Sequence, residues 1–357
     1  MTLPSNAITP VPDIGVLHCT GPDTLSFLQG QLSNDFALLK HNQARLAAFL
    51  SAKGRMQASF IAVRYGPHDV LLFVHHSILA AVQKRLSMFI LRAKVKIIDA
   101  SGQWQLLGAL GQAVSTVVQS MHGNTVEEFM PWQCFSNTDA QTGPQPKAVD
   151  AGGVEPESTH VPAWSITLYP AAQQPRALYI QPSQAQLPAC IADLAAPDKQ
   201  DILAKTWAWS EVLSGIATIS APVVDLFVPQ MLNYESVGGI NFKKGCYPGQ
   251  EVVARSQFRG AIKRRTYLAH GQKLPVPATG AEIYSTEDLE QPCGTVVQVA
   301  QDPASANGSF DALISIKTDT AAQHLVIRHT EAQAQGEAPM ETPISIKAVP
   351  YALLEDI

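Results

Sequence analysis

The sequence changes its pattern near Arg265, and this change constrains the fold more than any other feature. After this residue only short runs of strand-forming residues occur, and turn-rich segments separate them. Such a pattern is typical of a small all-β unit, either a barrel or a sandwich. We therefore predict an all-β domain over residues 263–357, with strands at 266–269, 282–284, 295–299, 312–316, 325–327 and 344–348.

Before Arg265, patterns typical of strands and helices alternate. Gly21-Pro22-Asp23 is expected to open one helix, and Ser77 is expected to cap a second. This order predicts an antiparallel or mixed sheet with helices on one face. The first twelve residues contain three prolines and are expected to form a loose lead-in. The expected strands are 14–19, 46–51, 56–63, 70–74, 94–98 and 104–110.

A second α+β unit follows. It should contain strands at 164–168 and 177–180 and a helix from Asp198 to about Leu213, which Gly215 ends. Residues 136–160 are polar and rich in Gly and Pro, so they predict a mobile loop. We expect residues 13–115 together with 215–262 to form the first α+β domain, and residues 116–214 to form the second.

Length and composition agree with a globular protein of several domains. The chain has 357 residues, whereas single cores seldom grow beyond about 250–300 residues. Hydrophobic residues make up 46% and charged residues 15%, which excludes global disorder and a coiled coil. No run of 18 apolar residues occurs, so we expect no membrane contact. The N-terminal residues lack the features of a secretory signal.

The spacing of the cysteines and the absence of common sequence motifs exclude several classes of protein. The five cysteines are scattered, odd in number and without a C-x-x-C pair, so we expect neither a disulfide framework nor a zinc ribbon, and we predict a cytoplasmic protein. The sequence has no P-loop, no dinucleotide fingerprint, no H-E-x-x-H and no G-x-S-x-G. Adjacent His75 and His76 would point to opposite faces of a strand, so we predict no metal site.

Positive charge is concentrated in one segment of an acidic chain. The net charge is −5, yet the segment 243–265 holds seven basic residues and one acidic residue, so it carries +6 and the remainder −11. This distribution favours one specific anionic ligand or a short stretch of phosphate backbone over general binding to nucleic acid, and we expect no DNA partner. Arg255 and Arg259 lie four residues apart and would share a helix face, either to grip an anion or simply to face solvent.

Cys246 lies in the same segment, within Lys244-Gly245-Cys246-Tyr247-Pro248-Gly249. Pro248 suits the first position of a helix, so Cys246 would lie just ahead of a helix N-terminus and beside two lysines. Both features stabilise a thiolate over a thiol, and a thiolate can act as nucleophile, redox sensor or soft metal ligand. The alternative is a buried cysteine packed as a small hydrophobic residue.

Two tryptophans lie on the predicted helix 198–213. Trp207 and Trp209 are two residues apart, which places them about 200° apart around the helix axis. Trp209 joins the apolar stripe, so Trp207 should leave it, where its ring could stack on a flat ligand. The alternative is that a second domain covers Trp207.

The segment Lys244-Gly245-Cys246-Tyr247-x-Gly249-Gln250-Glu251 resembles the K-G-C-Y-x-G-Q-E signature of the YgfZ family of folate-binding, tRNA-modification proteins. Further similarity lies in Phe227-Val228-Pro229-Gln230, in Gln29-Gly30-Gln31-Leu32 and in Ala52-Lys53-Gly54-Arg55-Met56. It covers roughly residues 14–100 and 207–270.

The resemblance implies the fold of the related aminomethyltransferase, the T-protein of glycine cleavage. That fold is α+β, with two ferredoxin-like units and a C-terminal β-barrel around a central folate cavity. It implies tetrahydrofolate as cofactor, with Cys246 and Lys244 as the reactive residues. The family's folate-contacting tryptophans fall at Trp207 and at Ile14, where this chain departs from the family. We expect further cofactor contacts from the polar and aromatic residues of the matching blocks, namely Gln31, Tyr247, Gln250, Glu251, Arg255 and Arg259.

Three functions are therefore considered. The first is a tetrahydrofolate-binding accessory protein that supports iron–sulfur enzymes or their assembly proteins, including the enzyme that methylthiolates tRNA. The second is a one-carbon transferase, which is opposed by Gln57 and Ala58, because they stand where the T-protein's catalytic aspartate should follow the Gly54 turn. The third is a non-enzymatic module that binds tRNA or a protein through residues 243–265.

Overall fold

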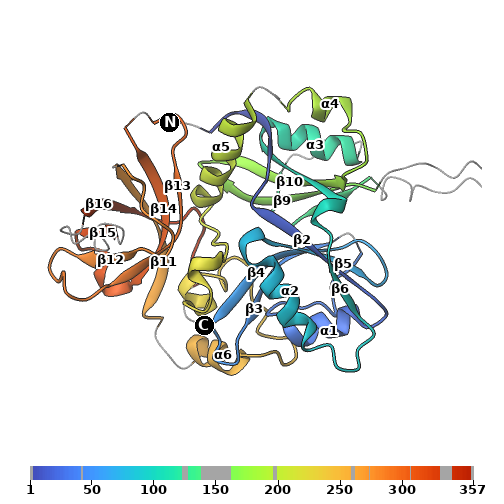
Figure 1. Ribbon diagram of the computed structural model, residues 1–357, viewed down its shortest axis with the longest axis horizontal. Coiled ribbons are helices and arrows are strands. Elements are labelled where there is room, and N and C mark those ends of the chain that lie inside the picture. The colour runs from blue at the N-terminus through green and yellow to red at the C-terminus, as the bar shows by residue number, and fades with distance from the viewer. Residues whose placement is uncertain are drawn as a thin grey trace, which may run out of the picture.

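The structure, a computed structural model, consists of two five-stranded sheets and a closed β-barrel (Figure 1). It describes residues 3–41, 43–122, 128–137, 162–195, 199–258, 262–272, 274–305, 307–329 and 340–354. All statements below concern these residues. The predicted fold class, α+β with a C-terminal β-barrel, is confirmed.

The first sheet has the strand order β3-β4-β5-β2-β6, and every pairing in it is antiparallel. Two helices, α1 and α2, pack on one face through Phe27, Leu28, Val82 and Leu86, which join the largest hydrophobic core. The strands are β2 (Ile14–Thr20), β3 (Ala44–Leu50), β4 (Met56–Arg64), β5 (Asp69–His75) and β6 (Lys96–Asp99). The helices are α1 (Thr24–Gln31) and α2 (Leu79–Ser87).

The second sheet has the order β1-β7-β10-β9-β8 and is also antiparallel. Helices α3 and α4 cover its outer face, where Val114, Val117 and Ile191 form a separate core. The strands are β1 (Asn6–Pro10), β7 (Trp104–Gly111), β8 (Cys134–Ser136), β9 (Trp164–Ala171) and β10 (Gln174–Pro182). The helices are α3 (Gln112–His122) and α4 (Ala189–Ala192).

The inner faces of the two sheets pack against each other. Val16 and Phe73 of the first sheet share a core with Trp164 and Ile166 of the second. Strands in both sheets are therefore apolar on both faces, which accounts for their long buried runs. The result is four layers, helix–sheet–sheet–helix, with one hydrophobic core between the two sheets.

The barrel closes in the order β11-β14-β13-β12-β15-β16 and lies beside this sandwich (Figure 1). Helix α5 (Gln200–Leu213) runs between the barrel and the second sheet, and contacts β1, β13 and β14. On the barrel side, the Trp209 indole Nε1 donates a hydrogen bond to Asp311 Oδ2 at 2.8 Å. The strands are β11 (Arg264–Gln272), β12 (Glu282–Ser285), β13 (Gly294–Gln301), β14 (Ser309–Lys317), β15 (Leu325–His329) and β16 (Met340–Lys347).

Several local expectations were wrong. Residues 6–10 are not a loose lead-in but strand β1, which pairs with β7 at the edge of the second sheet. Ser77 does not cap α2: its hydroxyl instead accepts a hydrogen bond from the Ala221 backbone N–H at 3.0 Å. The division into domains also differs from the prediction. Strand β7 lies within residues 13–115 and strand β1 precedes them, yet both strands belong to the second sheet.

Other predictions fall partly outside the described residues. Of the expected loop 136–160, Ser136 ends strand β8, and residues 138–160 lie outside the described part of the chain. Asp198 also lies outside it, and the helix begins at Gln200. In the described part, no helix has both the length and the apolar character needed to cross a membrane.

Candidate functional site

The motif loop, residues 244–249, carries Cys246 on the surface. The Cys246 side chain is exposed, and helix α6 (Gln250–Phe258) begins shortly after it. Two other motif residues, Lys244 and Tyr247, are buried. The loop is thus held from within and presents its thiol outward, which excludes the alternative of a cysteine buried as a hydrophobic residue.

Lys244 ties this loop to the end of α1. Its Nζ donates hydrogen bonds to the backbone oxygens of Gln29 and Leu32, both at 2.5 Å, and lies 4.6 Å from the centre of the Tyr247 ring. Burial lowers the pKa of Lys244 to about 8, while Asp35 and Cys246 act in the opposite direction. Lys244 therefore satisfies carbonyls that a helix end leaves without partners, and places a cation near the thiol.

Two glycines fix the approach of the motif loop to the Gly54 turn. Gly249 has φ +78° and Gly54 has φ +71°, both in the left-handed region. A Cβ at Gly249 would lie 2.5 Å from the Ser51 carbonyl oxygen and 2.7 Å from the Gly54 Cα. The two sequence blocks that matched the family therefore touch each other, backbone against backbone.

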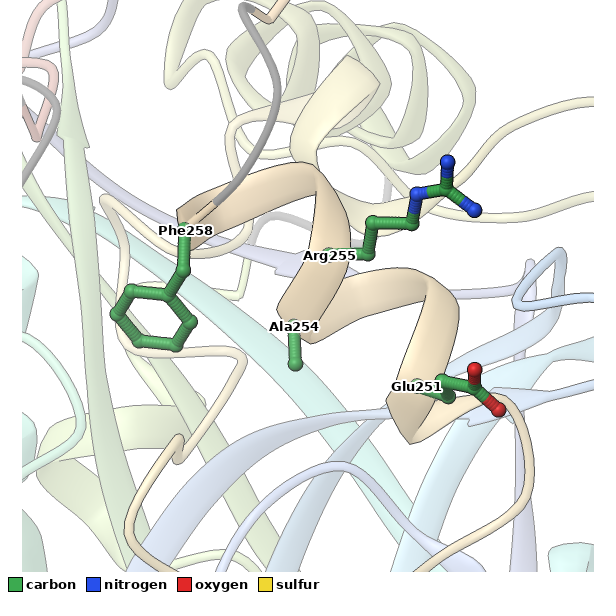
Figure 2. A pocket seen from close by; sticks show the side chains of 4 residues that line it. All are labelled: Glu251, Ala254, Arg255 and Phe258. Carbon is green, nitrogen blue, oxygen red and sulfur yellow. The ribbon is translucent and has the colours of Figure 1, made fainter.

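An open pocket of about 850 Å³ lies on α6 and is lined by Glu251, Ala254, Arg255 and Phe258 (Figure 2). Glu251 and Arg255 extend from one side of the helix, whereas Phe258 projects from the other. Arg259 lies outside the described residues. Arg265, also in the basic segment, pairs with Glu235 at 2.6 Å, so part of the positive charge serves the fold.

A second cavity of about 50 Å³, narrower and more enclosed than the first, lies where the first sheet, α5 and Trp132 meet, and is called the internal cavity below. Its lining is mostly apolar and aromatic, with one carboxylate, Glu211 of α5. Burial raises the pKa of Glu211 to about 7, although Arg176 lowers it. The other lining residues are Ile14, Leu46, Ser59, Phe60, Ile61, Phe73, Val74, His75, Trp132, Ile216, Ala217, Thr218 and Tyr234.

Trp207 lies one helical turn before Glu211, but its ring is covered. Its exposed fraction is 2%, and its ring fills the space above Gly108, where a Cβ would come within 2.2 Å of it. The Arg176 guanidinium lies 4.5 Å from the centre of the Trp207 ring. Trp207 does leave the stripe of Trp209, because the two rings pack in different cores, and the alternative that a second domain covers Trp207 holds: the second sheet buries it.

Arg176 is a buried cation beside this cavity wall. Burial lowers its pKa to about 10, and Glu211 acts in the opposite direction. Its Nε and Nη2 have no hydrogen-bond partner among the residues that the structure describes. Arg176 and Glu211 therefore stabilise each other's charged form, although no ion pair joins them among the described residues.

The structure therefore divides the predicted site residues between two places. Ile14 lines the internal cavity, whereas Cys246 and Arg255 do not. Gln31, at the end of α1, is half-buried, and Gln250 and Glu251 begin α6. Sequence reasoning missed Glu211 and Trp132, which no local motif marks. Within the described ranges, no group of three or more metal-ligating side chains gathers.

Comparison with known proteins places the chain among relatives named tRNA-modifying protein YgfZ. It is 30% identical to that protein of Edwardsiella ictaluri over 275 residues, 77% of this chain and 72% of the relative. It is 28% identical to that of Cronobacter sakazakii over 292 residues, 81% and 79% of the two chains, and 26% identical to that of Yersinia enterocolitica over 347 residues, 96% and 92%.

One solved structure, the glycine cleavage system aminomethyltransferase T from Bartonella henselae, has a similar fold. The TM-score is 0.60 at 16% identity, and the match covers 98% of this chain and 87% of the other. The implied T-protein fold is thereby confirmed as a fold. No protein-family model matches the chain.

Proposed function

The chain belongs to the YgfZ family of tRNA-modifying proteins, and we propose that it binds tetrahydrofolate in the internal cavity and uses Cys246 to support iron–sulfur enzymes. The enzyme that methylthiolates tRNA is one such client. The cavity and the cysteine act as separate sites, one for the cofactor and one for a macromolecular partner. The proposed location is the cytoplasm.

The observation that carries the folate proposal is Glu211, a half-buried carboxylate that lines a cavity of mostly apolar and aromatic side chains. One edge of a pterin ring presents an amino group and a ring N–H, and an ionised carboxylate can accept both hydrogen bonds. A carboxylate with a strongly raised pKa in a cavity is also typical of a functional site. The donor and acceptor chemistry of the cavity therefore fits a pterin, with Glu211 holding its polar edge.

The size of the cavity adds one requirement. A void of about 50 Å³ is much smaller than the roughly 300–1,000 Å³ of small-molecule sites. A side chain of the wall must therefore move when tetrahydrofolate binds. Tetrahydrofolate, when bound, would supply one-carbon chemistry, and the residues of this chain would orient it and exclude water.

Exposure of Cys246 supports a role toward a partner protein rather than toward the folate. The thiol faces outward from a loop that Lys244 and Tyr247 hold rigidly. A rigid, exposed thiol beside a cation suits contact with a large partner.

The two alternatives receive less support. Strand β4 brings no carboxylate to the cavity: Gln57 donates a hydrogen bond to Asp225 Oδ2 at 3.1 Å, and Ser59 lines the wall. The one-carbon transferase thus lacks its expected aspartate on this strand. The tRNA-binding module loses three of its cations to the fold. Lys244 donates to the oxygens of Gln29 and Leu32, Arg264 donates to the Cys293 oxygen, and Arg265 pairs with Glu235.

Titration with tetrahydrofolate tests the cofactor site. Glu211→Gln should weaken binding about 10- to 100-fold, because a hydrogen bond to a charged group contributes about 1.5–3 kcal/mol. Asp201→Asn is the matched control, since Asp201 is an exposed carboxylate on the same helix, and it should bind as the wild type does. Equal binding by Glu211→Gln and wild type would contradict the site.

Complementation of a strain that lacks the protein tests the thiol. Cys246→Ala should fold and bind tetrahydrofolate normally yet fail to restore tRNA methylthiolation. Cys190→Ala removes another exposed cysteine and should restore it fully. Full restoration by Cys246→Ala would exclude the thiol role.

A further inference from the structure

A surface pocket of about 570 Å³ lies directly outside the internal cavity. Two residues, Leu46 and Trp132, line both spaces, so their side chains form the partition between them. The remaining residues that line the surface pocket are Asn34, Gln43, Ala44, Arg45, Gln133, Cys134, Phe135 and Gly238. Removal of the partition would join an internal void to an open pocket of the size that small-molecule ligands occupy.

Of the two partition residues, Trp132 is the one that can move. Leu46 belongs to strand β3, is 3% exposed and packs in the largest core. Trp132 lies outside any strand, is only partly buried, and has φ +67°, a strained value for a large side chain. Among the described residues, its ring donates one hydrogen bond, from Nε1 to the Val237 oxygen at 3.1 Å, and meets the Tyr169 ring edge-on with 5.9 Å between the ring centres.

The backbone of Trp132 is anchored by bonds that do not involve its ring. The Trp132 N–H donates to the Thr167 oxygen at 2.8 Å, and the Thr167 N–H donates to the Gln133 oxygen at 2.9 Å. These bonds anchor the segment to strand β9. Rotation of the side chain about this anchored backbone would open the partition at the cost of one hydrogen bond and some ring packing.

The surface pocket is equipped for a carboxylate. Arg45 is half-exposed, and its guanidinium makes only long hydrogen bonds, to Asn34 Oδ1 at 3.4 Å and to the Leu38 oxygen at 3.3 Å. Gln43 and Gln133 each use their side-chain oxygen to accept from a backbone N–H, at 3.0 Å and 2.9 Å, which leaves their amide N–H groups as donors for a ligand in the pocket. None of the described lining residues is acidic.

We propose that Trp132 gates the internal cavity and that the surface pocket around Arg45 binds the glutamyl tail of the folate. This inference rests on the proposed function, because it assumes that the pterin occupies the cavity. The tail would pass the displaced Trp132 ring and present its carboxylates to Arg45. Each further glutamate adds a carboxylate, so the site should prefer polyglutamyl over monoglutamyl tetrahydrofolate.

Binding of monoglutamyl and triglutamyl tetrahydrofolate tests the tail site. The wild type should bind the triglutamyl form about tenfold more tightly, and the ratio should fall as salt is raised. Arg45→Gln should bring the ratio close to one. Arg85→Gln removes an exposed arginine from α2 and should leave the ratio unchanged.

Stopped-flow kinetics test the gate. Trp132→Ala should raise both the association and dissociation rate constants several-fold, and Trp132→Phe should raise them less. If Trp132→Ala does not fold, Trp132→Phe alone decides, and unchanged rates overturn the gate. Equal affinity of the wild type for the two folates overturns the tail site while leaving the pterin cavity intact. Failure to bind either folate overturns the proposed function as well.

Discussion

The motif loop and the internal cavity place their reactive groups in opposite surroundings. The loop is one short stretch of sequence that buries Lys244 and Tyr247 and exposes Cys246. The cavity gathers residues from distant parts of the chain, among them Ile14, Trp132 and Glu211, and encloses its carboxylate. This difference is the basis of the proposed division of roles, with a small molecule at the cavity carboxylate and a partner at the exposed thiol.

The largest expected effect is on stability, and it tests the close backbone contact between the motif loop and the Gly54 turn. Gly249→Ala should lower the free energy of unfolding by about 3 kcal/mol, because a Cβ at φ +78° would press on the Gly54 turn. Gly245→Ala is the control in the same loop, since a Cβ there would meet no heavy atom within 4 Å. Urea denaturation of both variants measures the difference, and equal stability would refute the close backbone contact.

A smaller effect, dependent on pH, tests the surroundings of Glu211. Because burial raises its pKa from 4.5 to about 7, the folded protein holds this proton more tightly than the unfolded chain. Its contribution to stability is therefore full below about pH 4.5 and is lost as the pH rises through about 7. Glu211→Gln lacks this titration.

The melting temperature of Glu211→Gln relative to wild type should accordingly rise between these two pH values. We expect a relative gain of about 2–4 °C at pH 8 over pH 4.5. Asp201→Asn, measured in parallel, controls for the loss of a carboxylate from the same helix. A difference between Glu211→Gln and wild type that is constant with pH would show that Glu211 is not enclosed.

The smallest expected effect is a change in tryptophan fluorescence, which distinguishes Trp132 from Trp207. Trp132 lines the cavity, whereas Trp207 is covered by Arg176 and Gly108. Tetrahydrofolate should quench tryptophan fluorescence, and Trp132→Phe should remove more of the quench than Trp207→Phe. The reverse order would place the ligand against Trp207, as the sequence predicts when the Trp207 ring stacks on a flat ligand.

The contrast between the regions also explains what the sequence could predict. Strands β2, β4 and β5 and the C-terminal strands follow from short apolar runs bounded by turn residues, and the motif loop is contiguous. Strand β1 was missed because prolines suggested a loop, yet Pro10 ends an edge strand, where a missing N–H is tolerated.

The cavity could not be predicted, because its residues meet only through tertiary packing. A helical wheel of α5 treats the helix as covered on one side, but the second sheet and the barrel cover it on two, so Trp207 and Trp209 are both buried. The same enclosure turns Glu211 from an ordinary helix-surface charge into a cavity carboxylate. Trp132 follows no periodic pattern and becomes a wall only when strand β9 fixes its backbone.

The separation of the two sites is the central claim, and the rate of alkylation of Cys246 tests it most directly. Mass spectrometry can follow the reaction of this thiol with iodoacetamide, with and without saturating tetrahydrofolate. We predict the same rate in both cases, because the proposed folate site is the internal cavity, whereas the thiol lies on the surface. Strong protection of Cys246 by tetrahydrofolate would contradict the account and place the thiol at the folate site.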